Sequence, residues 1–223
     1  MTSPLISNRA GSESSMESMS DWLQLHSRQV SWVVIGLFVV VGGGWFYTRS
    51  QSLKAERAVT AYSGVQQSIA SGNLPLAESD LRKLITRYDG TRAALQGSLV
   101  LAQLLYQEGK LEDGIAELKK AAPKLESSKD FGASAHLLLA GGYEQTKKFV
   151  EAAHEYEAAA KAARFDADRQ RYQSLAAEDY LIAGRKDDAR RIWTALAADS
   201  KGTLAGEARI RLGELDATPE PKG

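Results

Sequence analysis

Four breaks at a regular spacing constrain the fold of this chain more than any other feature of its sequence. After Ser52, apolar residues recur every three or four positions, which is the spacing of an amphipathic helix. Short polar segments interrupt this pattern at Gly72, Gly109, Lys147 and Gly184. These positions are 37, 38 and 37 residues apart. A fixed period of this length predicts an array of helix pairs, each of which buries its apolar faces against its neighbours.

The four repeats share residue types as well as spacing. Seven residues before each break lies a small or β-branched residue: Val65, Ala102, Ala140 and Ala177. Five residues after each break lies a small residue: Ala77, Gly114, Ala152 and Ala189. Four positions further lies a large one: Leu81, Leu118, Tyr156 and Trp193. Small residues let two helices approach closely, and a large residue one turn away fills the neighbouring gap.

This pattern, over residues 58–200, resembles the tetratricopeptide repeat, an antiparallel helix pair of about 34 residues. The segment Gly202–Leu215 carries another small and apolar helix pattern, and we expect it to cap the last open face of the array. The resemblance implies an all-α fold: an α-solenoid of about four such helix pairs plus a capping helix. A single N-terminal transmembrane helix is expected to precede it.

The expected transmembrane helix is the uncharged stretch of residues 29–48, which Arg28 and Arg49 bracket. Its interior, Val30–Tyr47, would reach ~27 Å as a helix, close to the thickness of the hydrocarbon core of a bilayer. It ends in the bulky Trp45-Phe46-Tyr47, and no small-residue cleavage site follows, so we predict a retained anchor and not a signal peptide.

The sequence therefore predicts four segments. They are a disordered or amphipathic tail (1–28), the anchor (29–48), the helical repeat domain (49–216) and a C-terminal tail (217–223). No Gly or Pro separates Arg49 from Ser63, so we expect the first helix of the array to run on from the anchor.

Composition argues against an enzyme. The chain has no cysteine, and its 28 basic and 28 acidic residues give no net charge that would favour nucleic acid. No nucleophile, phosphate-loop or dinucleotide motif is present. His136 and His154, with Glu155 or Glu157, could in principle hold a metal, but their spacing matches no metal motif, so surface or partly buried roles are favoured. We therefore predict no catalytic residue, cofactor or metal.

The whole layout resembles the YfgM-type family. The matching segments are WVVIGLFVVVGGGWFYTRSQ, AERAVTAYSGVQ and LVLAQLLYQEGKLEDGIAEL. The resemblance implies a protein–protein interaction scaffold of the bacterial inner membrane, ancillary to the SecYEG translocon. Its repeat domain would be periplasmic, and its partners would be translocon subunits, chaperones or translocating chains.

The alternative is an assembly factor for another cell-envelope complex, or an adaptor that faces the cytoplasm. Arg28 stands alone before the anchor, whereas Arg49, Lys54 and Arg57 follow it, and that charge distribution favours the cytoplasm-facing orientation.

In tetratricopeptide repeats the first helix of each pair lines the concave face, so the resemblance also implies a binding surface. The candidate protein-binding residues are Tyr62, Leu99, Gln103, Tyr106 and Leu137. For Leu99 and Leu137, packing between repeats is at least as good an explanation. The Lys, Arg and Asn cluster that grips C-terminal carboxylates in other repeats is replaced here mostly by Gln, Leu and Tyr.

Overall fold

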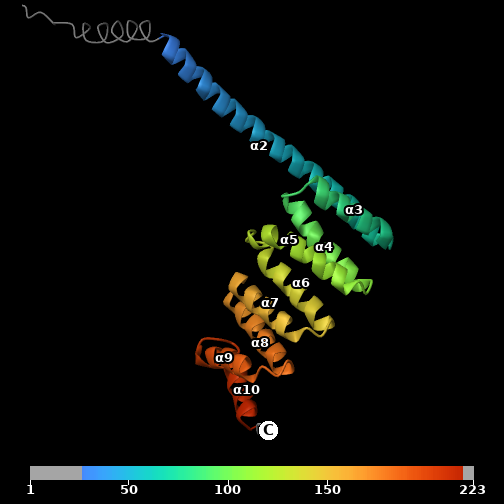
Figure 1. Ribbon diagram of the computed structural model, residues 1–223, viewed down its shortest axis with the longest axis vertical. Coiled ribbons are helices and arrows are strands. Elements are labelled where there is room, and N and C mark those ends of the chain that lie inside the picture. Colours follow the sequence, from blue (N-terminus) through green and yellow to red (C-terminus); the bar gives the residue numbers. More distant parts are fainter. Residues whose placement is uncertain (1–26, 218–223) are drawn as a thin grey trace, which may run out of the picture. The chain divides into compact units, whose positions relative to one another are not determined.

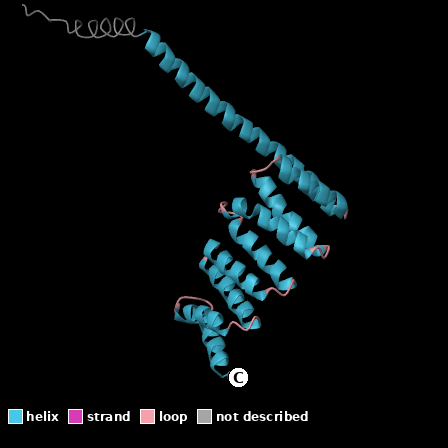
Figure 2. Cartoon of the chain, in the orientation of Figure 1, coloured by secondary structure: helices cyan, strands magenta, loops and turns pink. Residues whose placement is uncertain are grey.

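The computed structural model describes residues 27–217, except for the side chains of residues 27–31 and 33–35. Within this range the chain consists of helices joined by short loops, and no strand is present (Figure 2). The all-helical prediction is therefore confirmed. Contacts divide the chain into an N-terminal unit, Met1–Leu53, and a C-terminal unit, Lys54–Gly223.

The N-terminal unit contributes the first part of helix α2 (Ser27–Ala70). The large side chains from Leu37 to Val41 are each between 62% and 76% exposed. Among the residues that the structure describes, no helix is both long and apolar enough to cross a bilayer. The predicted anchor, 29–48, includes side chains outside the described set, and most of the predicted tails, 1–26 and 218–223, also lies outside it.

The C-terminal unit begins with the last part of α2 and continues through eight further described helices. They are α3 (Leu74–Arg87), α4 (Arg92–Gln107), α5 (Leu111–Glu126), α6 (Gly132–Gln145), α7 (Phe149–Ala162), α8 (Asp166–Ile182), α9 (Lys186–Ala198) and α10 (Ala205–Ala217). Within this unit, Figure 1 shows the helices stacked in sequence order. Four antiparallel pairs result: α2–α3, α4–α5, α6–α7 and α8–α9.

The four predicted breaks are the tight turns within these pairs. Gly72, Gly109 and Gly184 have φ angles of 74°, 75° and 75°, and Lys147 has 59°. At each turn the residue after the break donates its backbone N–H to the carbonyl five positions earlier, as Lys110 does to Leu105 at 2.8 Å. This left-handed ending satisfies carbonyl groups that the helix would otherwise leave unpaired. Each break therefore marks a helix end that reverses the chain.

The predicted close contacts form the core. Every residue that shares the small or the large position of the repeat is buried: Val65, Ala77, Leu81, Ala102, Gly114, Leu118, Ala140, Ala152, Tyr156, Ala177, Ala189 and Trp193. Neighbouring pairs share this core, because Leu101 and Leu105 of α4 pack with Val65 of α2 and Leu81 of α3. The phase of the sequence alignment is therefore confirmed.

The two ends of the array are closed differently. At the start, α2 exposes four residues at repeat positions that α4 buries: Arg57, Thr60, Gly64 and Gln67. Their equivalents in α4 are the buried Ala94, Gly97, Leu101 and Leu104. At the other end, Ala208 and Leu215 of α10 pack on the cluster that contains Trp193. The exposed face of α2 and the packing of α10 on this cluster both act as caps.

Candidate protein-binding groove

A groove of about 430 Å³ lies between the first helices α4 and α6. Its lining is Gln96, Leu99, Val100, Gln103, Asp130, Phe131, Ser134, Leu137 and Leu138. It contains three of the five residues predicted for binding: Leu99, Gln103 and Leu137. The floor is apolar, and the amides and the hydroxyl can exchange hydrogen bonds with a polypeptide backbone.

The two helices line this groove with residues at the same repeat positions. Gln96, Leu99, Val100 and Gln103 are spaced so that they share one face of α4. The repeat places Ser134, Leu137 and Leu138 at the equivalent positions of α6. Leu99 is only 9% exposed and belongs to the core between α4 and α6, so packing between repeats also explains it. Leu137 is half-buried and Gln103 is exposed, so both can contact a ligand.

One rim of the groove carries paired charges. Asp130 forms an ion pair with Arg92, and Arg164 lies 3.6 Å from its other carboxylate oxygen. The guanidinium of Arg92 also lies 5.3 Å from the centre of the Phe131 ring. Asp130 is the one charged residue among those described for the lining, and both of its carboxylate oxygens already face arginines. The groove therefore favours an uncharged, partly apolar segment.

Tyr106 has a packing role beneath the groove. Its ring lies against Gly114 of α5 and Gly142 of α6. Its hydroxyl donates a hydrogen bond to the carbonyl of Leu138, a groove residue, at 3.2 Å. Burial, with a smaller contribution from Tyr143, raises the pKa of Tyr106 well above its ordinary value. Its predicted part in binding stays a prediction, whereas its geometry holds α4, α5 and α6 together.

Tyr62 is half-buried and packs on a different cluster, with Ala58 of its own helix, Leu84 of α3 and Ala93 of α4. The five candidate residues therefore lie in different places within the C-terminal unit. Three line the groove, Tyr106 supports it from below, and Tyr62 belongs to the packing of the first pair. A direct role for Tyr62 in binding remains a prediction.

The same face becomes polar toward the C-terminus. A second groove, of about 310 Å³, lies between α8 and the segment that leads into α10. Arg171, Ser174 and Leu175 line it at positions equivalent to Gln96, Leu99 and Val100 of the first groove. Glu207 lines its other side. The apolar surface for a ligand is therefore concentrated at α4 and α6.

The two histidines of the third pair lie in separate interactions. His136 Nδ1 is 2.7 Å from Glu155 Oε2. His154 Nδ1 is 3.2 Å from the hydroxyl of Tyr180, which donates to Glu157 at 2.9 Å. Between residues 27 and 217, no group of three or more described His, Asp or Glu side chains is arranged to hold a metal ion. His136 therefore connects α6 to α7, and His154 connects α7 to α8.

Sequence reasoning missed a buried carboxylate. Asp179 of α8 is 3% exposed, and its Oδ2 has no hydrogen-bond partner among the described residues. Burial, with repulsion from Glu144 and Glu178, raises the pKa of Asp179 to about 7. A signal was present in the alignment, because the same repeat position holds Leu104 and Gly142, both of which are buried.

Antiparallel helix pairs whose first helices share a groove define a helical-repeat protein. The sequence matches the model of the tetratricopeptide repeat-like domain over residues 20–216, and the chain belongs to this family. Such domains are typically non-catalytic scaffolds for protein–protein interaction. Among curated proteins, no sequence is significantly similar to this chain.

Proposed function

We propose that this protein is a membrane-tethered scaffold whose groove between α4 and α6 binds a polypeptide segment. The observation that carries the proposal is the apolar floor flanked by Gln96, Gln103 and Ser134. Apolar pockets give a bound segment affinity, and side-chain amides and hydroxyls pair with its backbone. The paired state of Asp130 removes the need for a charged ligand group.

The tether is the first part of α2. Five consecutive side chains, Leu37 to Val41, cover every side of a helix that turns once in 3.6 residues, and all of them are exposed. A helix that is apolar all round needs a non-aqueous environment, and a bilayer supplies one. Trp45, Phe46 and Tyr47 would then lie at the membrane interface, which aromatic side chains favour. We propose that residues 29–48 cross the bacterial inner membrane once.

The proposed setting is the periplasmic side of the Sec translocon, with translocon subunits, chaperones or translocating chains as partners. The resemblance to the YfgM-type family supports this setting. An adaptor that faces the cytoplasm is the second candidate, because Arg49, Lys54 and Arg57 follow the anchor. Protease added to intact spheroplasts should remove the repeat domain. Protection that ends only on lysis would favour the second candidate.

A photo-crosslinking amino acid at Gln103 tests the groove in living cells. The exposed position of Gln103 in the groove should give adducts that mass spectrometry assigns to translocon subunits or chaperones. Leu137→Asp should abolish these adducts. The control is Ile182→Asp, which introduces a carboxylate at an exposed side chain of α8, and it should leave them intact. Adducts with another envelope complex would support the alternative partner, and adducts unchanged by Leu137→Asp would exclude the groove.

A further inference from the structure

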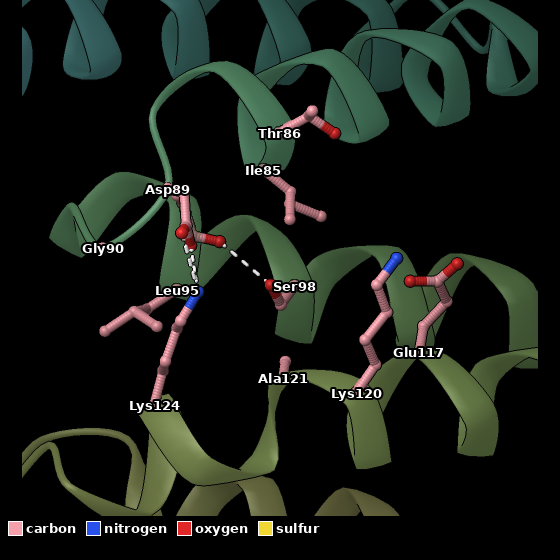
Figure 3. A pocket seen from close by; sticks show the side chains of 11 residues that line it. Ile85, Thr86, Asp89, Gly90, Leu95, Ser98, Glu117, Lys120, Ala121 and Lys124 are labelled. Atoms are coloured by element: carbon pink, nitrogen blue, oxygen red, sulfur yellow. Dashed lines mark hydrogen bonds and ion pairs between the residues drawn. The ribbon is translucent and has the colours of Figure 1, made fainter.

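A cleft of about 280 Å³ lies between α3 and α5, on the side of α4 opposite the groove between α4 and α6. It is bounded by α3 and α5, and Figure 3 shows Ile85 of α3 and Ala121 of α5 on facing sides. Ala94 and Ser98 of α4 form its floor. They lie about half a helical turn from the residues of α4 that line the groove, so a ligand in one site does not occupy the other.

At the equivalent place in the next repeat, a hydrogen bond between side chains crosses the space. There, His136 replaces Ser98 and Glu155 replaces Glu117. His136 Nδ1 and Glu155 Oε2 are 2.7 Å apart, so a hydrogen bond joins α6 to α7 across the space. In the cleft, the Ser98 hydroxyl donates instead to its own helix, and Glu117 is paired with Arg82 at 2.6 Å. The short side chain of Ser98 leaves the cleft open.

Two repeats further on, the same place is smaller. Arg169 and Gln173 of α8 occupy the positions of Ala94 and Ser98. The space between α7 and α9 is about 120 Å³ there, less than half of the 280 Å³ between α3 and α5. Long side chains are thus compatible with this position of the fold. The open cleft between α3 and α5 is a consequence of two short residues.

The charges around the cleft leave one cation without a partner. Asp89 is paired with Lys124 at 2.6 Å (Figure 3). Glu117 is paired with Arg82 of α3. Lys120 is exposed and makes no ion pair with any described residue. A ligand that combines an apolar group with a carboxylate would fill the apolar space and pair with Lys120. A ligand that carries a cation would gain no ion pair with Lys120.

We propose that the cleft between α3 and α5 is a second protein-binding site. It accepts an apolar side chain of a partner polypeptide whose neighbouring carboxylate pairs with Lys120. The partner segment approaches the second helices of the first two pairs, on the side of α4 opposite the groove. This site is additional to the groove between α4 and α6, and does not depend on it.

Two short peptides test the site on the full chain in a mild detergent. The probes are acetyl-Gly-Leu-Glu-Gly-amide and the same peptide with Gln in place of Glu. Methyl NMR of labelled Ile, Leu and Ala should show shifts at Ile85, Leu95 and Ala121, which line the cleft. The Glu peptide should bind about two- to fivefold more tightly, as one exposed ion pair allows. Lys120→Ala should remove that preference.

Ser98→His introduces the residue that the next repeat carries at this position, and should weaken both peptides at least about tenfold. The proposal is overturned if the cleft methyls do not shift, if the two peptides bind equally, or if folded Ser98→His binds as the original chain does. Shifts confined to the methyls of Leu99 and Leu137 would assign binding to the groove and also overturn it. Should Ser98→His not fold, retention of the preference in Lys120→Ala overturns the proposal.

Discussion

A Cβ atom placed on Gly142 would lie 2.3 Å from the hydroxyl oxygen of Tyr106. The Tyr106 ring also meets Gly114, where an added Cβ would lie 2.4 Å from a ring carbon. The ring is thus confined between two glycines on different helices, and its hydroxyl is bonded to Leu138. Neither glycine has room for a side chain unless the ring moves, and at Gly142 the side chain of Ile115, 2.9 Å from an added Cβ, would have to move as well.

Adjacent glycines on α6 provide a matched pair of substitutions. Gly142→Ala should destabilise the protein by about 1–3 kcal/mol, since overfilling a confined contact outweighs the better helix propensity of alanine. Gly141→Ala should stabilise it by roughly 0.5–1 kcal/mol, because no heavy atom lies within 4 Å of an added Cβ there. Urea denaturation of both variants gives the comparison. Equal effects of the two substitutions would contradict the confinement of Tyr106.

Lys147 is the one described non-glycine residue with a positive φ, at the position where the other three turns have glycine. Left-handed backbone costs an L-residue about 1–2 kcal/mol. Glycine avoids this cost, but it loses more conformational entropy on folding, which offsets part of the gain. Lys147→Gly should therefore raise the free energy of unfolding by about 0.5–1 kcal/mol, as measured by urea denaturation. The reverse change, Gly184→Lys, should lower it. A destabilising Lys147→Gly would show that the turn holds no strain.

The repeat could be predicted because its signals are local. The turns at Gly72, Gly109, Lys147 and Gly184 follow from spacing, and the buried small residues follow from their phase relative to these turns. The groove residues Leu99 and Leu137 follow from the same phase. These features need only the periodicity of the helix and the length of the repeat.

The orientation of Tyr106 could not be predicted in the same way. Gln103 and Tyr106 are one helical turn apart, so periodicity gives both the same face. What separates them is the room that Gly114 and Gly142 leave on neighbouring helices. The open cleft had a partial signal, because the alignment places Ser98 where the next repeat has His136. Whether a short residue leaves a space depends on how its neighbours pack.

Gln170 connects the cap to the last pair. Its side-chain amide donates to Asp199 at 2.9 Å, and its oxygen accepts from the backbone N–H of Thr203 at 3.0 Å. Gln170→Ala removes both hydrogen bonds. Because Asp199 and Thr203 are exposed and can pair with water instead, we expect a loss of about 0.5–1.5 kcal/mol for each bond. Hydrogen exchange in α10 should become faster. Gln103→Ala, at an exposed position on α4, is the control. Unchanged exchange in α10 would show that the apolar contacts of Ala208 and Leu215 alone hold the cap.

The buried carboxylate of Asp179 makes stability depend on pH. Its pKa of about 7 in the folded protein is higher than the value of 3.8 of an ordinary aspartate, so the folded state binds the proton more tightly than the unfolded state. The preferential binding of this proton by the folded state adds fully to the free energy of unfolding below pH 3.8. That contribution falls as the pH rises from 3.8 and is lost by about pH 7. Other carboxylates near it, Glu144 and Glu178, increase the cost of its charge.

Asp179→Asn removes that charge and keeps the shape of the side chain. We expect the variant to be more stable than the original chain by roughly 2–4 kcal/mol at pH 8. A pKa raised from 3.8 to about 7 corresponds to about 4 kcal/mol at most. The advantage should shrink steadily toward pH 5 and disappear near pH 4. Urea denaturation at several pH values measures it. Glu144→Gln, which removes one repelling carboxylate, should move the transition to lower pH. An advantage that is the same at pH 5 and pH 8 would contradict the raised pKa of Asp179 and would assign the effect to packing alone.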